Sequence, residues 1–288
     1  MQPEIIVGLD GTPESLSAAH WAAREAKRHG FTLRLLHVWI TTPGTAAESP
    51  DLPLETVPAR RLLQDAETDL RERHPDVPVT SELLAADSSI ALLETAAKAE
   101  LLVLGPQTLG SARGYLLGSL TLQAVAGCER PVVLVRTDDQ SDDVRSAAGR
   151  PGAVVVAVSL RPGYDGTLAF AFDAAARRSA TLLAFHATNR RRSTGFRERP
   201  PKETEELAAH QALGAALRPW HEKYPYVRVV EQLSHESAGR ALVDTASEAR
   251  LLVVGRGGHR NPLTPRIGPV THAAIHHAAC PVAIIPHD

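Results

Sequence analysis

The chain has 288 residues, of which 43% are hydrophobic and 22% charged, and its formal net charge is -2 at pH 7. These proportions are typical of a folded globular protein and exclude a wholly disordered or collagen-like chain. The nearly neutral charge provides no general attraction to nucleic acid or to an anionic membrane, so we expect neither as a partner. At about 150 residues per domain, the length predicts two domains.

The amino terminus and the cysteine content both favour a cytoplasmic protein. The first residues lead directly into an apolar run at Ile5, without the basic segment and longer apolar stretch of a secretory signal. The two cysteines, Cys128 and Cys280, are too few for a disulfide framework and lack the spacing of a zinc site. The apolar runs are far shorter than the roughly 20 residues of a membrane-spanning helix. We therefore expect a cytoplasmic location and no membrane partner.

The first half alternates short apolar runs with longer segments of helical periodicity, which predicts a parallel sheet built from βαβ units. The apolar runs lack polar alternation, so helices should cover both faces of the sheet. The expected strands are residues 5–9, 33–38, 77–84, 101–104 and 132–135. The expected helices are residues 15–28, 55–73, 88–99 and 115–127.

The second half repeats the first. Residues 21–37 align without gaps on residues 170–186, so that His37 and His186 are equivalent at an offset of 149. The strands expected in the second half are residues 154–158, 182–185, 227–233, 251–254 and 282–285. We therefore predict two tandem, doubly wound, Rossmann-like α/β domains, each with a five-stranded parallel sheet, over residues 1–137 and 153–288, with a polar linker over 138–152.

Two other segments are rich in residues that break regular structure, residues 41–53 and 189–201. The second contains the consecutive arginines Arg190, Arg191 and Arg192. A solvated surface loop is the simpler interpretation of this basic run, and a loop that binds an anion or a partner is the alternative.

A glycine-rich segment follows the fourth strand of the first half. Gly105 is followed by Gly110, Gly114 and Gly118, and then by Ser119. Ligands of open parallel sheets bind outside the carboxyl ends of the strands, where glycines let backbone N–H groups and a helix start approach a phosphate. The segment has neither the lysine of a phosphate loop nor the dinucleotide fingerprint, so neither of those nucleotide-binding folds is indicated.

This segment resembles the signature of the universal stress protein family, Gly-x2-Gly-x9-Gly-Ser/Thr after the fourth strand. The opening Ile-Ile-Val-Gly-Leu-Asp-Gly-Thr-Pro-Glu-Ser at residues 5–15 and the last strand Pro-Val-Val-Leu-Val at residues 131–135 resemble the family too. The resemblance covers nearly the whole chain twice. It implies two domains of the adenine nucleotide alpha hydrolase-like type that form an internal pseudo-dimer by pairing their last strands; a homodimer of two chains is left open.

The resemblance also implies a site for ATP. In ATP-binding members an acidic residue at the end of the first strand holds the ribose, which is the place of Asp10, and backbone after the second strand brackets the adenine, at Val38. The glycine loop and its Ser/Thr take the phosphates. The residues implied for this role are Gly105, Thr108, Gly118, Ser119 and Thr121 in the first domain and Gly255, Gly258, Gly268 and Thr271 in the second. Asp10 alone could hold a Mg²⁺ that accompanies ATP.

Three positions depart from the signature. Thr108 replaces the second glycine of the first half, and Ser159 replaces the aspartate of the second half. Pro269 replaces the Ser/Thr of the second half and removes both a hydroxyl and a backbone N–H. The main expectation is a nucleotide-responsive stress-signalling module with an unidentified protein partner and the stronger site in the first domain. The departures leave open an interaction protein whose nucleotide sites have decayed.

No catalytic constellation is recognisable, because the chain lacks a nucleophile elbow, a phosphate-loop lysine and paired metal carboxylates. We therefore expect binding without catalysis, with a slow ATPase as a further alternative. His272, His276 and His277 lie on the last predicted helix, where the helix dipole explains histidines near the carboxyl end, so we expect no metal site. For His37 and His186 we favour buried, hydrogen-bonded histidines at strand ends, with ligand contact as the alternative.

Overall fold

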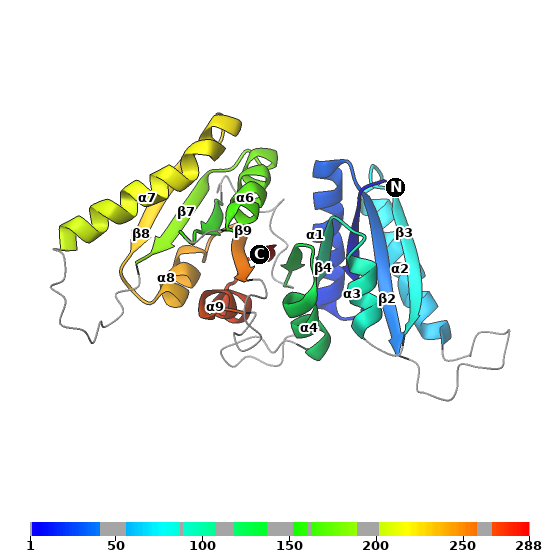
Figure 1. The fold of residues 1–288 in the computed structure, drawn as a ribbon. Coiled ribbons are helices and arrows are strands. Elements are labelled where there is room, and N and C mark those ends of the chain that lie inside the picture. The colour runs from blue at the N-terminus through cyan, green and yellow to red at the C-terminus, as the bar shows by residue number, and fades with distance from the viewer. Residues whose placement is uncertain are drawn as a thin grey trace. The chain divides into compact units, whose positions relative to one another are not determined.

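The computed structural model describes residues 2–40, 56–86, 89–106, 118–136, 152–160, 163–188, 202–257 and 267–287. The chain divides into two compact units, Met1–Gln140 and Ser141–Asp288, called unit 1 and unit 2 below (Figure 1). Both are α/β units with parallel strands, which confirms the fold class expected from the sequence. The predicted linker falls largely on residues 137–151, outside the described residues, so the domain boundaries stay predictions.

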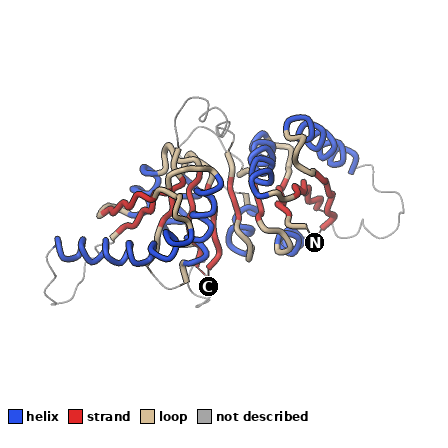
Figure 2. Tube along the Cα trace, turned by 90° about the horizontal axis from the view of Figure 1, so that it is seen from above, coloured by secondary structure: helices blue, strands red, loops and turns tan. Residues whose placement is uncertain are grey.

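The described part of unit 1 contains a parallel sheet with the strand order β3-β2-β1-β4-β5. Its strands are β1 (Glu4–Gly8), β2 (Thr32–Ile40), β3 (Val79–Ala86), β4 (Leu101–Leu104) and β5 (Val132–Leu134). Its helices are α1 (Pro13–His29), α2 (Val57–Arg73), α3 (Ser89–Ala96) and α4 (Ser119–Gly127). Helix α1 contacts α2 and helix α3 contacts α4, and Figure 2 shows helices on both sides of the strands.

Unit 2 repeats this arrangement with the strand order β10-β9-β6-β7-β8. Its strands are β6 (Val154–Ala157), β7 (Leu182–Ala187), β8 (Val229–Ser234), β9 (Leu251–Gly257) and β10 (Val282–His287). Its helices are α6 (Asp165–Arg177), α7 (Lys202–Lys223), α8 (Ala238–Thr245) and α9 (Pro269–His277). Val154 pairs with both Leu182 and Leu251, as Ile5 pairs with both Leu33 and Leu101. The strands of unit 2 therefore pair in the same register as the equivalent strands of unit 1.

Two element bounds differ from the prediction in ways that affect the site. Strand β2 continues past Val38 to Ile40, because β3 pairs alongside it over this length. Helix α4 begins at Ser119 and not at Tyr115, since Gly118 is its N-cap and has extended backbone, with φ -60° and ψ 156°. Val38 therefore lies inside a strand, and the glycine precedes the helix.

Apolar strands form the core of each unit. Ile6 and Val7 of β1 are fully buried, and so are Val154 and Val156 of β6. These strands are buried on both faces, which explains why their sequences do not alternate between apolar and polar residues. Alanines on α1, such as Ala22, are also fully buried and let the helix pack closely on the sheet.

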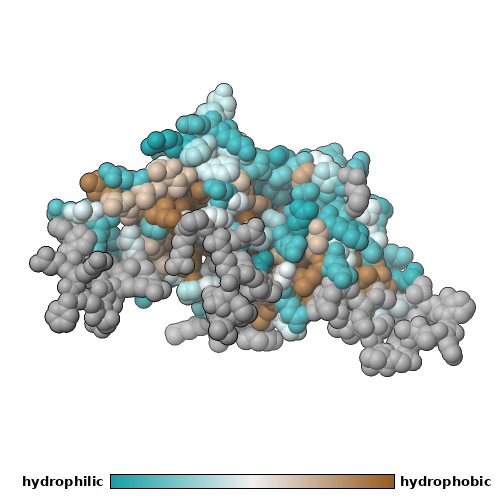
Figure 3. Space-filling model, viewed as in Figure 1, coloured by the Kyte–Doolittle hydropathy of each residue, from teal (hydrophilic) through white to brown (hydrophobic). Residues whose placement is uncertain are grey.

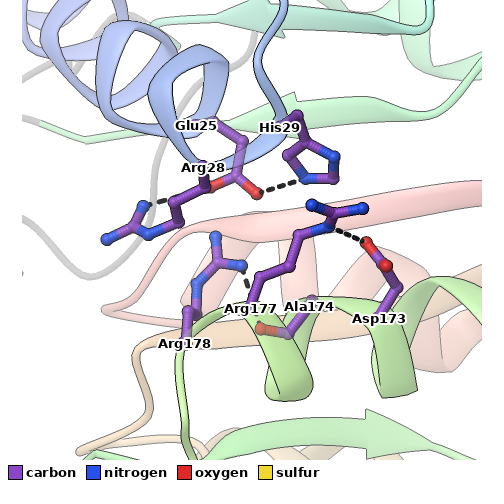
Figure 4. Close-up of polar contacts among 7 residues, drawn as sticks. All are labelled: Glu25, Arg28, His29, Asp173, Ala174, Arg177 and Arg178. Carbon is purple, nitrogen blue, oxygen red and sulfur yellow. Dashed lines mark hydrogen bonds and ion pairs between the residues drawn. The ribbon is translucent and has the colours of Figure 1, made fainter.

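Helices α1 and α6 end in basic residues at equivalent positions of the repeat (Figure 4). Arg28 Nη1 lies 3.2 Å from Glu25 Oε2, and Arg177 Nε lies 2.8 Å from Asp173 Oδ2. Arg178 is buried and donates from Nη1 to a backbone carbonyl of its own helix. Cations near the carboxyl end of a helix interact favourably with its dipole, so these residues have a structural role.

The described surface carries several large hydrophobic side chains, including Leu16, Leu120, Leu122 and Tyr226. On the face drawn in Figure 3, hydrophobic residues appear as patches between hydrophilic ones. Scattered exposed hydrophobic residues are normal for a folded protein. Within the described ranges, no helix combines the length and the apolar composition needed to cross a bilayer.

Candidate functional site

Each sheet has one place where the direction of strand addition reverses. In unit 1 it lies between β1 and β4, and in unit 2 between β6 and β9. The carboxyl ends of the strands at such a place border a crevice, which is where open α/β sheets bind their ligands. Asp10 follows β1 and Gly105 follows β4, so the fold brings these two predicted residues to the same crevice.

The turn between β1 and α1 holds the Asp10 carboxylate in one orientation. Asp10 Oδ1 accepts hydrogen bonds from the Thr12 backbone nitrogen at 3.0 Å and from Thr12 Oγ1 at 2.5 Å. Gly11 between them has φ +84°, a conformation that favours glycine. Thr12 also caps α1 by accepting from the Ser15 backbone nitrogen at 3.2 Å. Sequence reasoning missed Thr12, although the Asp-Gly-Thr-Pro pattern before a helix is a capping signal.

Gly105 allows the end of β4 to touch the first turn of α1. A Cβ atom at Gly105 would lie 2.3 Å from the Glu14 carbonyl carbon and 2.5 Å from the Ser15 backbone nitrogen. No side chain fits there, so the glycine is required by packing. The same helical turn thus fixes Asp10 on one side and the end of β4 on the other.

The third wall of the crevice comes from β2. Leu36 accepts a hydrogen bond from the Leu9 backbone nitrogen at 2.8 Å. Alternate residues of a strand direct their backbone groups to the same neighbouring strand. The backbone groups of Val38 therefore point to the same side as those of Leu36, toward β1, at a level beyond the last residue of β1. His37 Nδ1 donates to the Leu9 carbonyl oxygen at 2.7 Å, which makes it a half-buried, hydrogen-bonded histidine.

The start of α4 has the character of an anion-binding helix end. Its N-cap, Gly118, has no side chain to bond the first backbone N–H groups, and its first turn as described contains no acidic residue. Ser119 is exposed and Thr121 half-exposed at this end. Unbonded N–H groups and the helix dipole favour a phosphate. Thr108, in contrast, lies outside the described residues.

These residues fit an adenine nucleotide. Asp10 presents an acceptor oriented by Thr12, and the start of α4 has no side-chain hydrogen bond from its N-cap, Gly118. Among the described residues, no three His, Cys, Asp or Glu side chains gather as a metal site. A Mg²⁺ bound with a nucleotide needs only one or two carboxylates beside the phosphates, so Asp10 is compatible with it.

Unit 2 uses the equivalent positions differently. Ser159 stands at the place of Asp10. The Gly255 backbone N–H donates to Tyr164 Oη at 3.1 Å, and the Gly255 carbonyl accepts from Thr271 Oγ1 at 2.8 Å. Thr271 is buried and its hydroxyl hydrogen is directed to Gly255, so it is not available as a donor to a phosphate.

The start of α9 is also a weaker anion site than the start of α4. Gly268 is its N-cap with extended backbone, but Pro269 is its first residue and has no N–H to donate. The second glycine of the signature, Gly258, lies outside the described residues. Among the described residues, the start of α9 therefore offers fewer backbone N–H donors than the start of α4.

A cavity of about 340 Å³ lies next to Ser159 in unit 2. It is bordered by the turn before α6 and by α7, and most of its lining is apolar. Its lining residues are Ser159, Leu160, Gly163, Tyr164, Asp165, Leu168, Ala212 and Ala216. Sequence reasoning missed Tyr164, whose only signal was its alignment with Ser15 at the repeat offset of 149.

The histidines of α9 are neighbours on the helix. The ring centroids of His272 and His276 are 4.3 Å apart. Desolvation, followed by the charges of His276 and His277, lowers the pKa of His272. This crowding favours the neutral form of His272, and the described residues assemble no larger ligand set around these histidines.

The fold defines the class of this protein as a tandem α/β protein with two Rossmann-like units. The model of the universal stress protein family matches residues 1–136 and 152–286. The chain therefore belongs to the universal stress protein family, as its motifs indicated.

Relatives of similar length have the same tandem organisation. A universal stress protein of Mycobacterium tuberculosis is 32% identical over 282 residues, covering 92% of this chain and 91% of the relative. One from Mycolicibacterium smegmatis is 27% identical over 293 residues, covering 98% and 96%. The crystal structure of a universal stress protein from Archaeoglobus fulgidus covers 98% of both chains with a TM-score of 0.66 and 14% identity, which supports the fold.

Proposed function

We propose that unit 1 binds an adenine nucleotide, ATP in particular, and that the chain is a nucleotide-responsive stress-signalling module. Binding can carry a signal only if the bound and free forms differ in affinity for a partner, so the proposal includes a protein partner. The observation that carries it is the crevice between β1 and β4, where Asp10 and Gly105 are held by the same turn of α1.

The parts of the crevice suit different parts of the nucleotide. The Asp10 carboxylate can accept hydrogen bonds from the ribose hydroxyls, because its orientation is already fixed by Thr12. The backbone of Val38 turns toward the space where a base would lie. The uncapped start of α4 at Gly118 and Ser119 suits the phosphates.

The proposal is tested by titrating nucleotide-free protein with ATP and Mg²⁺ in a calorimeter. Any nucleotide that copurifies is first released and identified by chromatography. The variant Asp10→Asn keeps an oxygen that can accept from Thr12 but loses the charge, so the turn should survive. A hydrogen bond to a charged group contributes about 1.5–3 kcal/mol, so we expect ATP to bind roughly 10- to 100-fold more weakly.

The matched control is Ser159→Ala, which alters the equivalent position of unit 2. It should leave the affinity for ATP unchanged. Absence of binding by the unaltered protein, or equal binding by Asp10→Asn, would overturn the proposal. The result would then favour the alternative function, an interaction protein with decayed sites, for which the engaged Gly255 and Pro269 of unit 2 are the supporting observations.

We propose binding without catalysis. The described residues offer Asp10 as a carboxylate at the crevice, and no three of their His, Cys, Asp or Glu side chains gather as a metal site that could activate a nucleophile for phosphoryl transfer. Long incubation with Mg²⁺ and ATP should release no more phosphate from the unaltered protein than from Asp10→Asn. Phosphate release that depends on Asp10 would instead make the protein a slow ATPase.

A further inference from the structure

Tyr164 makes direct contact with the signature glycine of unit 2. Its hydroxyl accepts the hydrogen bond of the Gly255 N–H at 3.1 Å. A Cβ atom on Gly255 would lie only 2.7 Å from both Cε2 and Oη of Tyr164. The phenol ring therefore lies directly against the backbone of Gly255.

This contact crosses the ligand crevice of unit 2. Tyr164 comes from the connection between β6 and α6, and Gly255 lies near the carboxyl end of β9. Strands β6 and β9 are neighbours, and the strand order reverses between them. The tyrosine hydroxyl thus bonds a backbone donor at the place where an open α/β sheet receives its ligand.

The surroundings hold the tyrosine there. Burial raises the pKa of Tyr164 to about 12, so its hydroxyl stays protonated at neutral pH. The ring centroid of His287 lies 5.0 Å from that of Tyr164. Tyr164 also forms part of the wall of the 340 Å³ cavity beside Ser159, so this residue borders both that cavity and Gly255.

Unit 1 has a small side chain at the equivalent position. Ser15 aligns with Tyr164 at the repeat offset of 149. Its Oγ donates to the Thr12 carbonyl at 2.9 Å, within its own turn. Gly105 is approached by the backbone of Glu14 and Ser15, whereas Gly255 is approached by an aromatic ring. The two copies thus differ at this position as well as at Asp10 and Ser159.

We propose that the Tyr164 side chain closes the ligand crevice of unit 2 from within, so that the chain binds nucleotide in unit 1 alone. The ring fills the space against Gly255, and the hydroxyl takes the backbone donor that a ligand would use. This inference rests on the nucleotide binding proposed for unit 1.

The test replaces the tyrosine by its counterpart from unit 1. In the Asp10→Asn background, which weakens the unit 1 site, Tyr164→Ser is titrated with ATP and with adenosine by calorimetry. Adenosine is included because Pro269 weakens the phosphate end of unit 2. We expect the double variant to bind at least one of the two probes more than 10-fold more tightly than Asp10→Asn alone.

The control is Tyr164→Phe in the same background. It removes the hydroxyl but keeps the ring, so binding should remain as weak as in Asp10→Asn. The circular dichroism spectrum and thermal unfolding of each variant show that it is folded. A folded Tyr164→Ser variant that gains neither probe would overturn the inference, as would a second equivalent of ATP bound by the protein with Tyr164 intact.

These outcomes are separate from those of the proposed function. Failure of unit 1 to bind appears in the unaltered protein, before Tyr164 is changed. A gain of binding in Tyr164→Ser would then still show that the tyrosine closes unit 2.

Discussion

His37 Nδ1 donates a hydrogen bond to the Leu9 carbonyl oxygen at 2.7 Å, and His186 Nδ1 repeats this bond with the Val158 carbonyl at 2.9 Å. Each accepting carbonyl belongs to the residue just before the equivalent positions Asp10 and Ser159. The histidine therefore ties the end of the first strand of each unit to the second. In unit 1 the bond fixes the backbone that leads into Asp10.

Replacing His37 by alanine should loosen the approach to Asp10. Loss of one hydrogen bond of this kind costs about 1 kcal/mol, with a further loss from packing. We expect a lower midpoint of urea unfolding together with weaker ATP binding in calorimetry. His186→Ala is the matched control and should lower the midpoint by a similar amount while leaving the ATP affinity unchanged. An equal loss of affinity in both variants would show that His37 has no specific part in the unit 1 site.

Gly105→Ala should destabilise unit 1, because the added methyl group would meet the backbone of Glu14 and Ser15. Overpacking of this kind costs roughly 1–3 kcal/mol. Thermal unfolding should shift downward by several degrees. Gly118→Ala is the comparison, since none of the described residues lies within 4 Å of its Cβ position. Its cost should stay below about 1 kcal/mol, the usual difference between glycine and alanine at an N-cap. Equal shifts for both variants would contradict the close approach at Gly105.

Tyr164 should make unit 2 sensitive to alkaline pH. Burial raises its pKa from the ordinary value of 10.0 to about 12, so above pH 10 the unfolded chain loses this proton while the folded chain keeps it. Because the folded state then binds more protons, the free energy of unfolding falls as the pH rises, by up to about 1.4 kcal/mol per pH unit. Urea unfolding from about pH 9 to about pH 12 should show a shallower decline for Tyr164→Phe than for the unaltered protein. Parallel declines would contradict the burial of this hydroxyl.

His20 should make unit 1 sensitive to acid. Its Nε2 lies 3.0 Å from Asp69 Oδ2 and its Nδ1 lies 3.3 Å from His74 Nε2. Burial lowers the pKa of His20 below 6.5, and this effect exceeds the opposite effect of Asp69. Below about pH 6.5 the unfolded chain takes up the proton first, so stability is present above this pH and is lost as the pH falls.

The measurement is the urea midpoint between about pH 7 and about pH 5, compared for the unaltered protein and His20→Gln. The variant should lose less stability over this range, because glutamine does not titrate. A nuclear magnetic resonance titration of the His20 ring should give a midpoint below 6.5. A midpoint above 6.5 would show that the Asp69 ion pair outweighs burial.

The fold could be predicted because its signals are local and occur twice. Unbroken apolar runs such as residues 101–104 have no polar face, so they belong to strands covered on both sides. The offset of 149 between His37 and His186 revealed the second copy. Element ends were less predictable. The end of β2 at Ile40, for example, depends on the length over which β3 pairs with it.

Two site residues could be predicted because their residue type and their place after a strand were visible in the sequence. Asp10 after a strand and Gly105 before a close backbone approach were both identified from the sequence, and the structure brings them to one crevice. Thr12 was missed because its role depends on the geometry of the turn that follows Asp10. Whether Asp10 binds a ribose stays a prediction.

The sequence by itself determined the family, the two copies and the parallel α/β class, since these follow from periodicity and motif spacing along the chain. Only the tertiary structure decided that Tyr164 lies against Gly255 in unit 2. Tyr164 and Gly255 are 91 residues apart in the chain, and their hydrogen bond exists because β6 and β9 are adjacent in the sheet. The pairing of strands that are distant in the sequence decides which side chain lies in a crevice. Local sequence patterns therefore cannot predict that contact.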